Sequence, residues 1–78
     1  MAKLPQLTAI ELTKIIKRLG FELIRQEGSH MFFKHVDGRT TVVPNHPGEH
    51  IDRGLLTKII KKDLNLERED FIKLLKKR

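Results

Sequence analysis

Hydrophobic residues near the start of the chain recur at helical spacing. The apolar positions on this face are Leu12, Ile15, Ile16 and Leu19. Thr8 and Glu11 stand three residues apart just before them, which is the T-x-x-E capping box of a helix start. Gly20 follows the last apolar position, where a helix ends in the left-handed conformation. The pattern predicts an amphipathic helix between Thr8 and Gly20 whose apolar face covers a sheet.

After this helix the spacing of apolar residues changes to alternation, which is typical of strands. We expect strands over residues 21–26, 30–35 and 40–43. A short Gly-Ser connection separates the first strand from the second, a turn at Gly38 separates the second from the third, and a proline ends the third. The strands therefore form an antiparallel meander. In the first strand, alternation places Leu23 and Arg25 on one face and Ile24 on the other. The second strand has a phenylalanine on each face, which leaves open which face packs on the helices.

The last third of the chain predicts two more helices. Asp52 is a suitable N-cap for a helix whose apolar stripe comprises Leu55, Leu56, Ile59 and Ile60. Asn65 suits the left-handed position after that helix. A third helix follows, with Phe71, Leu74 and Leu75 on its buried side. The fold class is therefore α+β, a double-stranded-RNA-binding-like α-β-β-β-α order with a three-stranded antiparallel sheet and an added C-terminal helix, in a single domain over residues 1–78.

Composition narrows the function. The 78 residues include no cysteine, so neither disulfides nor thiolate zinc sites are available. No apolar run is long enough for a membrane span, and Met1 to Ile10 lacks the apolar core of a signal peptide, so a cytoplasmic protein without a membrane partner is expected. The net charge of +6 favours a polyanionic partner such as RNA. Tyr and Trp are absent, which favours contacts to the nucleic-acid backbone over base stacking.

One stretch combines residues suited to chemistry. Gly28 allows a close backbone approach, Ser29 offers a hydroxyl, and the His30 imidazole exchanges a proton near neutral pH without a metal. Together with Asp37-Gly38-Arg39, Val42-Val43-Pro44 and His46-Pro47-Gly48, this stretch resembles the HicA toxin family, small ribonucleases of toxin–antitoxin pairs. The likeness extends from about Leu12 to Leu75.

The resemblance implies both activity and partners. It implies a toxin that cleaves mRNA as a metal-independent endoribonuclease, with His30 as the catalytic residue, no cofactor, and a HicB-type antitoxin that covers the active face. His30 would act as general base or acid while a ribose 2′-OH attacks the adjacent phosphate, and Lys34, on the same strand face, would stabilise the developing charge. The family often has a second histidine where Met31 stands here, so that adjacent pair is missing.

Further residues are candidates for contact with RNA. They are Gly28, Ser29, Lys34, Arg25, Arg39 and His46. His46 matches the family position after the proline, whereas Glu49 and His50 reverse the charges usual in the family. The H-x-x-x-H spacing of His46 and His50 lacks the cysteine or helical context of a zinc site, so no metal site is expected. His35 receives no role.

The sequence leaves two other functions open. A domain of this fold can bind A-form RNA by shape without any catalysis. Alternatively, the chain is an interaction module, such as an antitoxin-like partner or an inactive copy of the enzyme. Only an active nuclease needs an imidazole at position 30, so a His30→Ala protein separates the nuclease from a module that only binds RNA. The toxin–antitoxin assignment also requires a small neighbouring open reading frame that encodes the partner.

Overall fold

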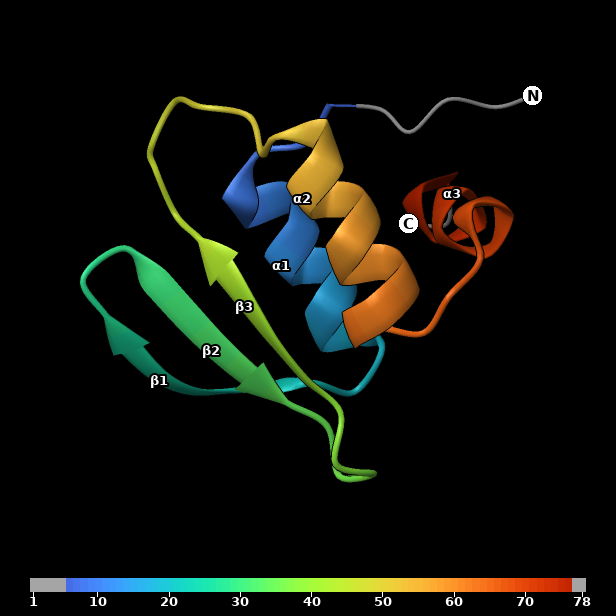
Figure 1. The fold of residues 1–78 in the computed structure, drawn as a ribbon, viewed down its shortest axis with the longest axis horizontal. Helices are drawn as coiled ribbons and strands as arrows, with labels where there is room; N and C mark the ends of the chain where they lie inside the picture. Colours follow the sequence, from blue (N-terminus) through green and yellow to red (C-terminus); the bar gives the residue numbers. More distant parts are fainter. Residues whose placement is uncertain (1–5, 77–78) are drawn as a thin grey trace.

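The computed structural model describes residues 6–76 of the chain. The elements in order are α1 (Ala9–Arg18), β1 (Glu22–Glu27), β2 (His30–Lys34), β3 (Thr40–Pro44), α2 (Arg53–Lys58), the π-helical turn η1 (Ile59–Asp63) and α3 (Arg68–Lys76). Figure 1 shows the sheet on one side, α3 on the opposite side, and α1 and α2 between them. The predicted α+β order with an added C-terminal helix is confirmed.

Helix α1 begins as its sequence predicts. The backbone N–H of Thr8 donates to the Glu11 carboxylate at 2.9 Å, and the backbone N–H of Glu11 donates to the Thr8 hydroxyl at 3.3 Å. This reciprocal pair satisfies two N–H groups that the first turn of a helix leaves without partners. Leu12 and Ile16 on the predicted apolar face are fully buried.

Helix α1 also ends at the predicted glycine. Gly20 has φ +102°, in the region that favours glycine. Its N–H donates to the Lys17 carbonyl at 3.0 Å, and the N–H of Phe21 donates to the Ile16 carbonyl at 3.3 Å. These two bonds form the Schellman motif, which turns the chain sharply from α1 into β1.

The three strands form an antiparallel sheet in the order β1-β2-β3. The structure decides the question that the two phenylalanines left open. The buried side chains of β2 and β3 are Met31, Phe33, Thr41 and Val43, and all lie on the face covered by the helices. His30, Phe32 and Lys34 therefore lie on the opposite face, which we call the open face.

Strand β1 departs from the simple alternation that its sequence predicts. Leu23 pairs with Phe33 but Arg25 pairs with Phe32, so Ile24 is an extra residue in a bulge. Because cross-strand partners share a face, the bulge separates Leu23 from Arg25 and brings Arg25 to the open face beside Phe32. The prediction that Leu23 and Arg25 share a face is wrong for this reason.

The segment after β3 carries the second helix, whose cap is confirmed. The Asp52 carboxylate accepts from the backbone N–H groups of Gly54 and Leu55 at 3.0 and 3.3 Å. Instead of continuing as an α-helix, the chain widens into η1, where the N–H of Leu64 donates to the Ile59 carbonyl. Asn65 then takes the predicted left-handed conformation with φ +56°.

One hydrophobic core joins the helices and the sheet. Its fully buried larger members are Phe33, Phe71, Leu12, Ile16, Leu56, Ile59, Ile60, Leu64 and Val43. Phe71 anchors α3 as predicted, while Leu74 and Leu75 are only partly buried. Within residues 6–76, each helix is too short or too polar to span a membrane.

Candidate active site

His30 opens β2 directly after a two-residue hairpin turn. Gly28 has φ +57° and Ser29 does not have a positive φ, which is the pattern of a type II′ turn with glycine at its first central position. The glycine is thus required by the turn itself. In the sheet register His30 lies between Glu27 of β1 and Pro44 of β3. Its imidazole is exposed on the open face and makes no hydrogen bond or ion pair with the residues that the structure describes.

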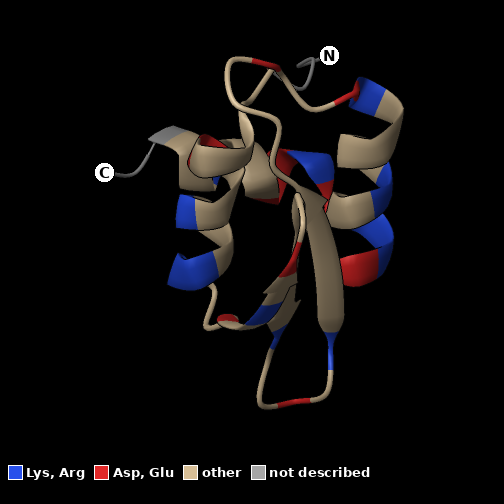
Figure 2. Ribbon diagram, turned by 90° about the vertical axis from the view of Figure 1, so that its left-hand side faces the viewer, with Lys and Arg blue, Asp and Glu red and all other residues tan. Residues whose placement is uncertain are grey.

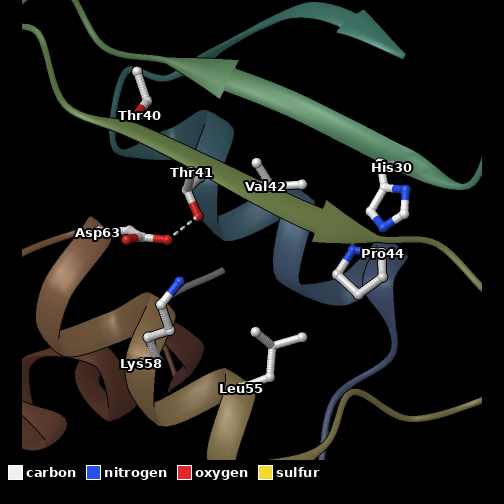
Figure 3. A pocket seen from close by; sticks show the side chains of 8 residues that line it. All are labelled: His30, Thr40, Thr41, Val42, Pro44, Leu55, Lys58 and Asp63. Atoms are coloured by element: carbon white, nitrogen blue, oxygen red, sulfur yellow. Dashed lines mark hydrogen bonds between the residues drawn. The ribbon is translucent and has the colours of Figure 1, made fainter. Parts of the chain in front are cut away.

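A shallow groove of ≈ 390 Å³ runs between β3 and the helix formed by α2 and η1. Its lining residues are His30, Thr40, Thr41, Val42, Pro44, Leu55, Lys58 and Asp63. Figure 3 shows His30 beside Pro44 at one end, with Leu55 below them, and Lys58 farther along the groove below Thr41 and Asp63. The groove therefore reaches from the imidazole to a cationic side chain that comes from a different element.

Arg25 is the predicted cation that the sheet places beside His30. Its guanidinium carbon lies 4.4 Å from the centre of the Phe32 ring, and it pairs with the Glu27 carboxylate at 3.4 Å. Glu27 lies directly opposite His30, so Arg25 is its diagonal neighbour, about 7–8 Å away across the two strands. This distance is within reach of a phosphate that contacts the imidazole.

Two more predicted residues lie at the same end of the sheet. The carbonyl of Ser29 accepts from the backbone N–H of Asn45 at 2.6 Å, which continues the pairing of β2 and β3 past Pro44. His46 follows and begins a type II turn, in which Gly48 has φ +80°. The exposed His46 lines a smaller hollow that shares Pro44 with the main groove, so it stands close to the His30 end.

Lys34 does not lie with these residues. It occupies the other end of β2 and pairs with Thr40 rather than with a neighbour of His30. Four steps along the strand separate its Cα from that of His30, a distance of about 13 Å. The structure therefore places Lys34 on the same face of β2 as His30, as predicted, but at the opposite end of the strand.

Arg39 lies at this distant end as well and makes internal contacts. Its Nη1 donates to the Leu64 carbonyl at 2.6 Å and its Nε to the Asp37 carboxylate at 2.7 Å, while its guanidinium lies 5.2 Å from the centre of the Phe21 ring. The backbone N–H of Arg39 also donates to Asp37 at 3.0 Å, and this bond is the largest cause that lowers the pKa of Asp37 below its ordinary value. Arg39 thus connects the β2–β3 turn to the end of η1.

With this geometry established, comparison with known families identifies the chain. The model of the HicA toxin of bacterial toxin–antitoxin systems matches residues 10–66, which is more than half of the chain. This chain belongs to the HicA toxin family. Membership confirms the resemblance found in the sequence and makes the chain a toxin that pairs with an antitoxin. A search of curated proteins finds no significant match.

The matched HicA region contains all of the elements that form the groove. The structure adds two residues that are not among the candidates from the sequence. Lys58 is one, because the sequence does not show that α2 passes beside β3. Glu27 is the other, because only the register of the strands places it opposite His30. Between residues 6 and 76, no three His, Asp or Glu side chains gather in a group that could hold a metal ion.

Figure 2 shows where the charge of this HicA-family toxin lies. Lysine and arginine bands are concentrated on the helices beside the sheet. The basic residues of α2 and η1 are Arg53, Lys58, Lys61 and Lys62. Of these residues Lys58 lines the groove, and Arg25 adds a cation on the open face. A polyanion that approaches His30 therefore meets positive charge on both sides.

Proposed function

We propose that this toxin is an endoribonuclease that cleaves mRNA and that His30 is its catalytic residue. The observation that carries the proposal is the contrast between His30, the first residue of β2, and His35, which directly follows β2. The His30 side chain is exposed and has no partner among the residues that the structure describes, whereas the ring of His35 is bonded to the Leu19 carbonyl. An mRNA substrate places the reaction in the cytoplasm.

The chemistry that fits this site needs a ribose. His30 takes the proton of a 2′-OH as that oxygen attacks the adjacent phosphorus, so an O2′–P bond forms and the P–O5′ bond breaks. The leaving O5′ takes a proton from the imidazolium or from water. The products are a 2′,3′-cyclic phosphate and a 5′-hydroxyl end, and an RNA with a deoxyribose at the cleavage position is not cut.

Arg25 is the cation best placed to stabilise the phosphate during this step. It lies one diagonal position from His30, and its guanidinium is supported by the Phe32 ring and the Glu27 carboxylate. A planar guanidinium matches two phosphate oxygens at once, and charge that develops in the transition state strengthens both hydrogen bonds. Ser29 and His46 border the same end, where they contact the RNA strand on either side of the scissile bond.

The test compares His30→Ala with His50→Ala on a labelled single-stranded RNA. His50 is also exposed and does not line the main groove; it forms a backbone bridge to Thr8 and interacts electrostatically with Glu11, so its replacement controls for the loss of a histidine as such. We expect His30→Ala to lose at least about 10²-fold in cleavage rate, as for loss of a general base, and His50→Ala to cut normally. Cleavage by His30→Ala at the wild-type rate contradicts the proposal.

The same experiment decides the non-catalytic alternative, which rests on the double-stranded-RNA-binding-like order of the elements. A module that only binds RNA shows no cleavage by the wild type, and its RNA affinity survives His30→Ala while falling steeply with salt. A nuclease shows cleavage by the wild type in the presence of a chelator. The toxin's antitoxin, which we propose is of the HicB type, should suppress that cleavage.

A further inference from the structure

Strand β3 has a neighbour on one side only, so half of its backbone groups point away from the sheet. One hydrogen bond lies just beyond each end of the paired strands β2 and β3. The N–H of His35 donates to the Arg39 carbonyl at one end, and the N–H of Asn45 donates to the Ser29 carbonyl at the other. Antiparallel pairing alternates between bonded and non-bonded positions. Positions 41 and 43 are therefore the bonded ones, and Thr40, Val42 and Pro44 direct their backbone groups to the outer edge.

This outer edge forms one wall of the groove described above. The opposite wall comes from α2 and η1, with Leu55, Lys58 and Asp63 (Figure 3). The side-chain hydroxyl of Thr41 donates to the Asp63 carboxylate at 2.9 Å and joins the two walls at one point. An open groove between a strand edge and a helix is the geometry in which an extended peptide adds to a sheet.

The polar groups on the edge distinguish a peptide from an RNA strand. Thr40 and Val42 each present one N–H and one carbonyl, about 6.8 Å apart along the strand, and Pro44 presents a carbonyl alone. A peptide strand has donors and acceptors at the same repeat and satisfies both kinds of group. Phosphodiester oxygens only accept hydrogen bonds, and the 2′-OH is the only donor of an RNA backbone, so an RNA strand does not match the alternating N–H and carbonyl groups of this edge.

Charge indicates which peptide fits. Lys58 makes no ion pair with the residues that the structure describes, and the whole chain carries +6. An acidic side chain of a bound strand forms an ion pair with Lys58, and an apolar side chain packs on Leu55. A second copy of this chain has the same positive charge, so pairing of two β3 edges opposes like charges.

We propose that an extended, acidic segment of the antitoxin binds in this groove as a fourth strand paired with β3. The existence of an antitoxin follows from the family, and the functional consequence rests on the proposed role of His30. Because His30 lies beside Pro44 at one end of the groove, a strand along β3 covers the imidazole. Inhibition thus occurs by addition of a strand.

The test removes one outward N–H without altering the pairing of β2 and β3. Val42→Pro does this, since proline is accepted on an edge strand where the N–H faces outward. Val42→Thr is the matched control, with nearly the same side-chain shape and the N–H retained. Calorimetric titration uses the purified product of the gene adjacent to the toxin gene. We expect Val42→Pro to weaken binding about tenfold or more, and Val42→Thr to bind within about twofold of the wild type.

Folding is checked by thermal melting and by the amide NMR spectrum. Should Val42→Pro unfold, the 78-residue chain is short enough for chemical synthesis with an ester in place of the amide at Val42, which removes only the N–H. Wild-type affinity of a folded variant overturns the proposal. So does a finding that Val42→Pro abolishes a dimer of the free chain, or reduces affinity for a non-cleavable RNA, while antitoxin binding is unchanged.

Cleavage of RNA by the free wild-type chain is measured in parallel. If the wild type does not cleave RNA, the proposed nuclease function fails, whereas the effect of Val42→Pro on antitoxin affinity still decides the mode of binding. If the wild type cleaves RNA and Val42→Pro binds the antitoxin normally, the strand-addition proposal alone fails.

Discussion

The Nε2 atom of His35 lies 3.1 Å from the carbonyl oxygen of Leu19, at the end of α1. The other ring nitrogen, Nδ1, accepts from the backbone N–H of Asp37 at 3.1 Å. The tautomer that carries its proton on Nε2 makes both bonds. The Asp37 carboxylate also lies 3.1 Å from Nδ1. The ring packs edge-on against Phe21, with 5.1 Å between centres. His35 therefore ties the α1–β1 turn to the β2–β3 turn.

This arrangement predicts that His35→Ala destabilises the fold. The replacement leaves the Leu19 carbonyl without its partner and removes the contact with Phe21, which together cost about 2 kcal/mol in the free energy of unfolding. Urea denaturation followed by circular dichroism measures the change. His30→Ala is the matched control and should change stability by less than about 0.5 kcal/mol, since its side chain is exposed. Equal stability of the two variants argues against this role for His35.

A second prediction concerns the glycine next to this histidine. A Cβ on Gly20 would lie 2.9 Å from Nε2 of His35, and the φ of +102° is itself unfavourable for alanine. Gly20→Ala should therefore lower stability by about 2 kcal/mol. Replacing His35 by alanine as well removes the steric part of this cost, so the double variant should lose less than the sum of the two single losses. Strict additivity in the double-mutant cycle would show that the ring and the glycine do not interact.

Local signals account for the parts of the fold that the sequence predicted well. The capping box at Thr8, the cap at Asp52 and the left-handed Gly20 and Asn65 depend on a few neighbouring residues, and all four are confirmed. The strand spans follow from alternation in the same way. Each of these features involves contacts within one turn or one hairpin, which a sequence displays directly.

The features that the sequence did not reveal depend on contacts between distant segments. The π turn η1 ends beside β3, where Asp63 accepts from Thr41 and the Leu64 carbonyl accepts from Arg39, 22 and 25 residues away in the chain. The bulge at Ile24 moves Arg25 to the open face. Consequently, the candidate RNA contacts divide into a group near His30 and a distant pair, Lys34 and Arg39, although the sequence presents them as one set.

That division predicts different effects of removing two exposed cations from the open face. Arg25→Gln takes away the guanidinium diagonal to His30, whereas Lys34→Gln removes a charge about 13 Å along β2. Since charge–charge stabilisation falls with distance and with screening by salt, we expect cleavage by Arg25→Gln to slow by about 10²-fold and cleavage by Lys34→Gln to slow by less than about threefold. Single-turnover cleavage of a labelled RNA measures both rates. A larger effect at Lys34 would place the scissile phosphate at the other end of the sheet.

The pKa of Asp37 leads to a prediction of how the stability of the fold depends on pH. Its pKa is lowered, first by the hydrogen bond from the backbone N–H of Arg39 and then by the Arg39 side chain. A carboxylate with a lowered folded-state pKa stabilises the fold at pH values above its ordinary pKa, and this contribution disappears as the pH falls through the folded-state pKa. Asp37→Asn should therefore melt below the wild type at pH 7, and the difference should shrink steadily below about pH 4. Glu49→Gln removes an exposed carboxylate without a side-chain partner among the described residues and serves as the control. A constant gap between Asp37→Asn and the wild type from pH 7 to pH 2.5 would show that the ionised form of Asp37 does not stabilise the β2–β3 turn.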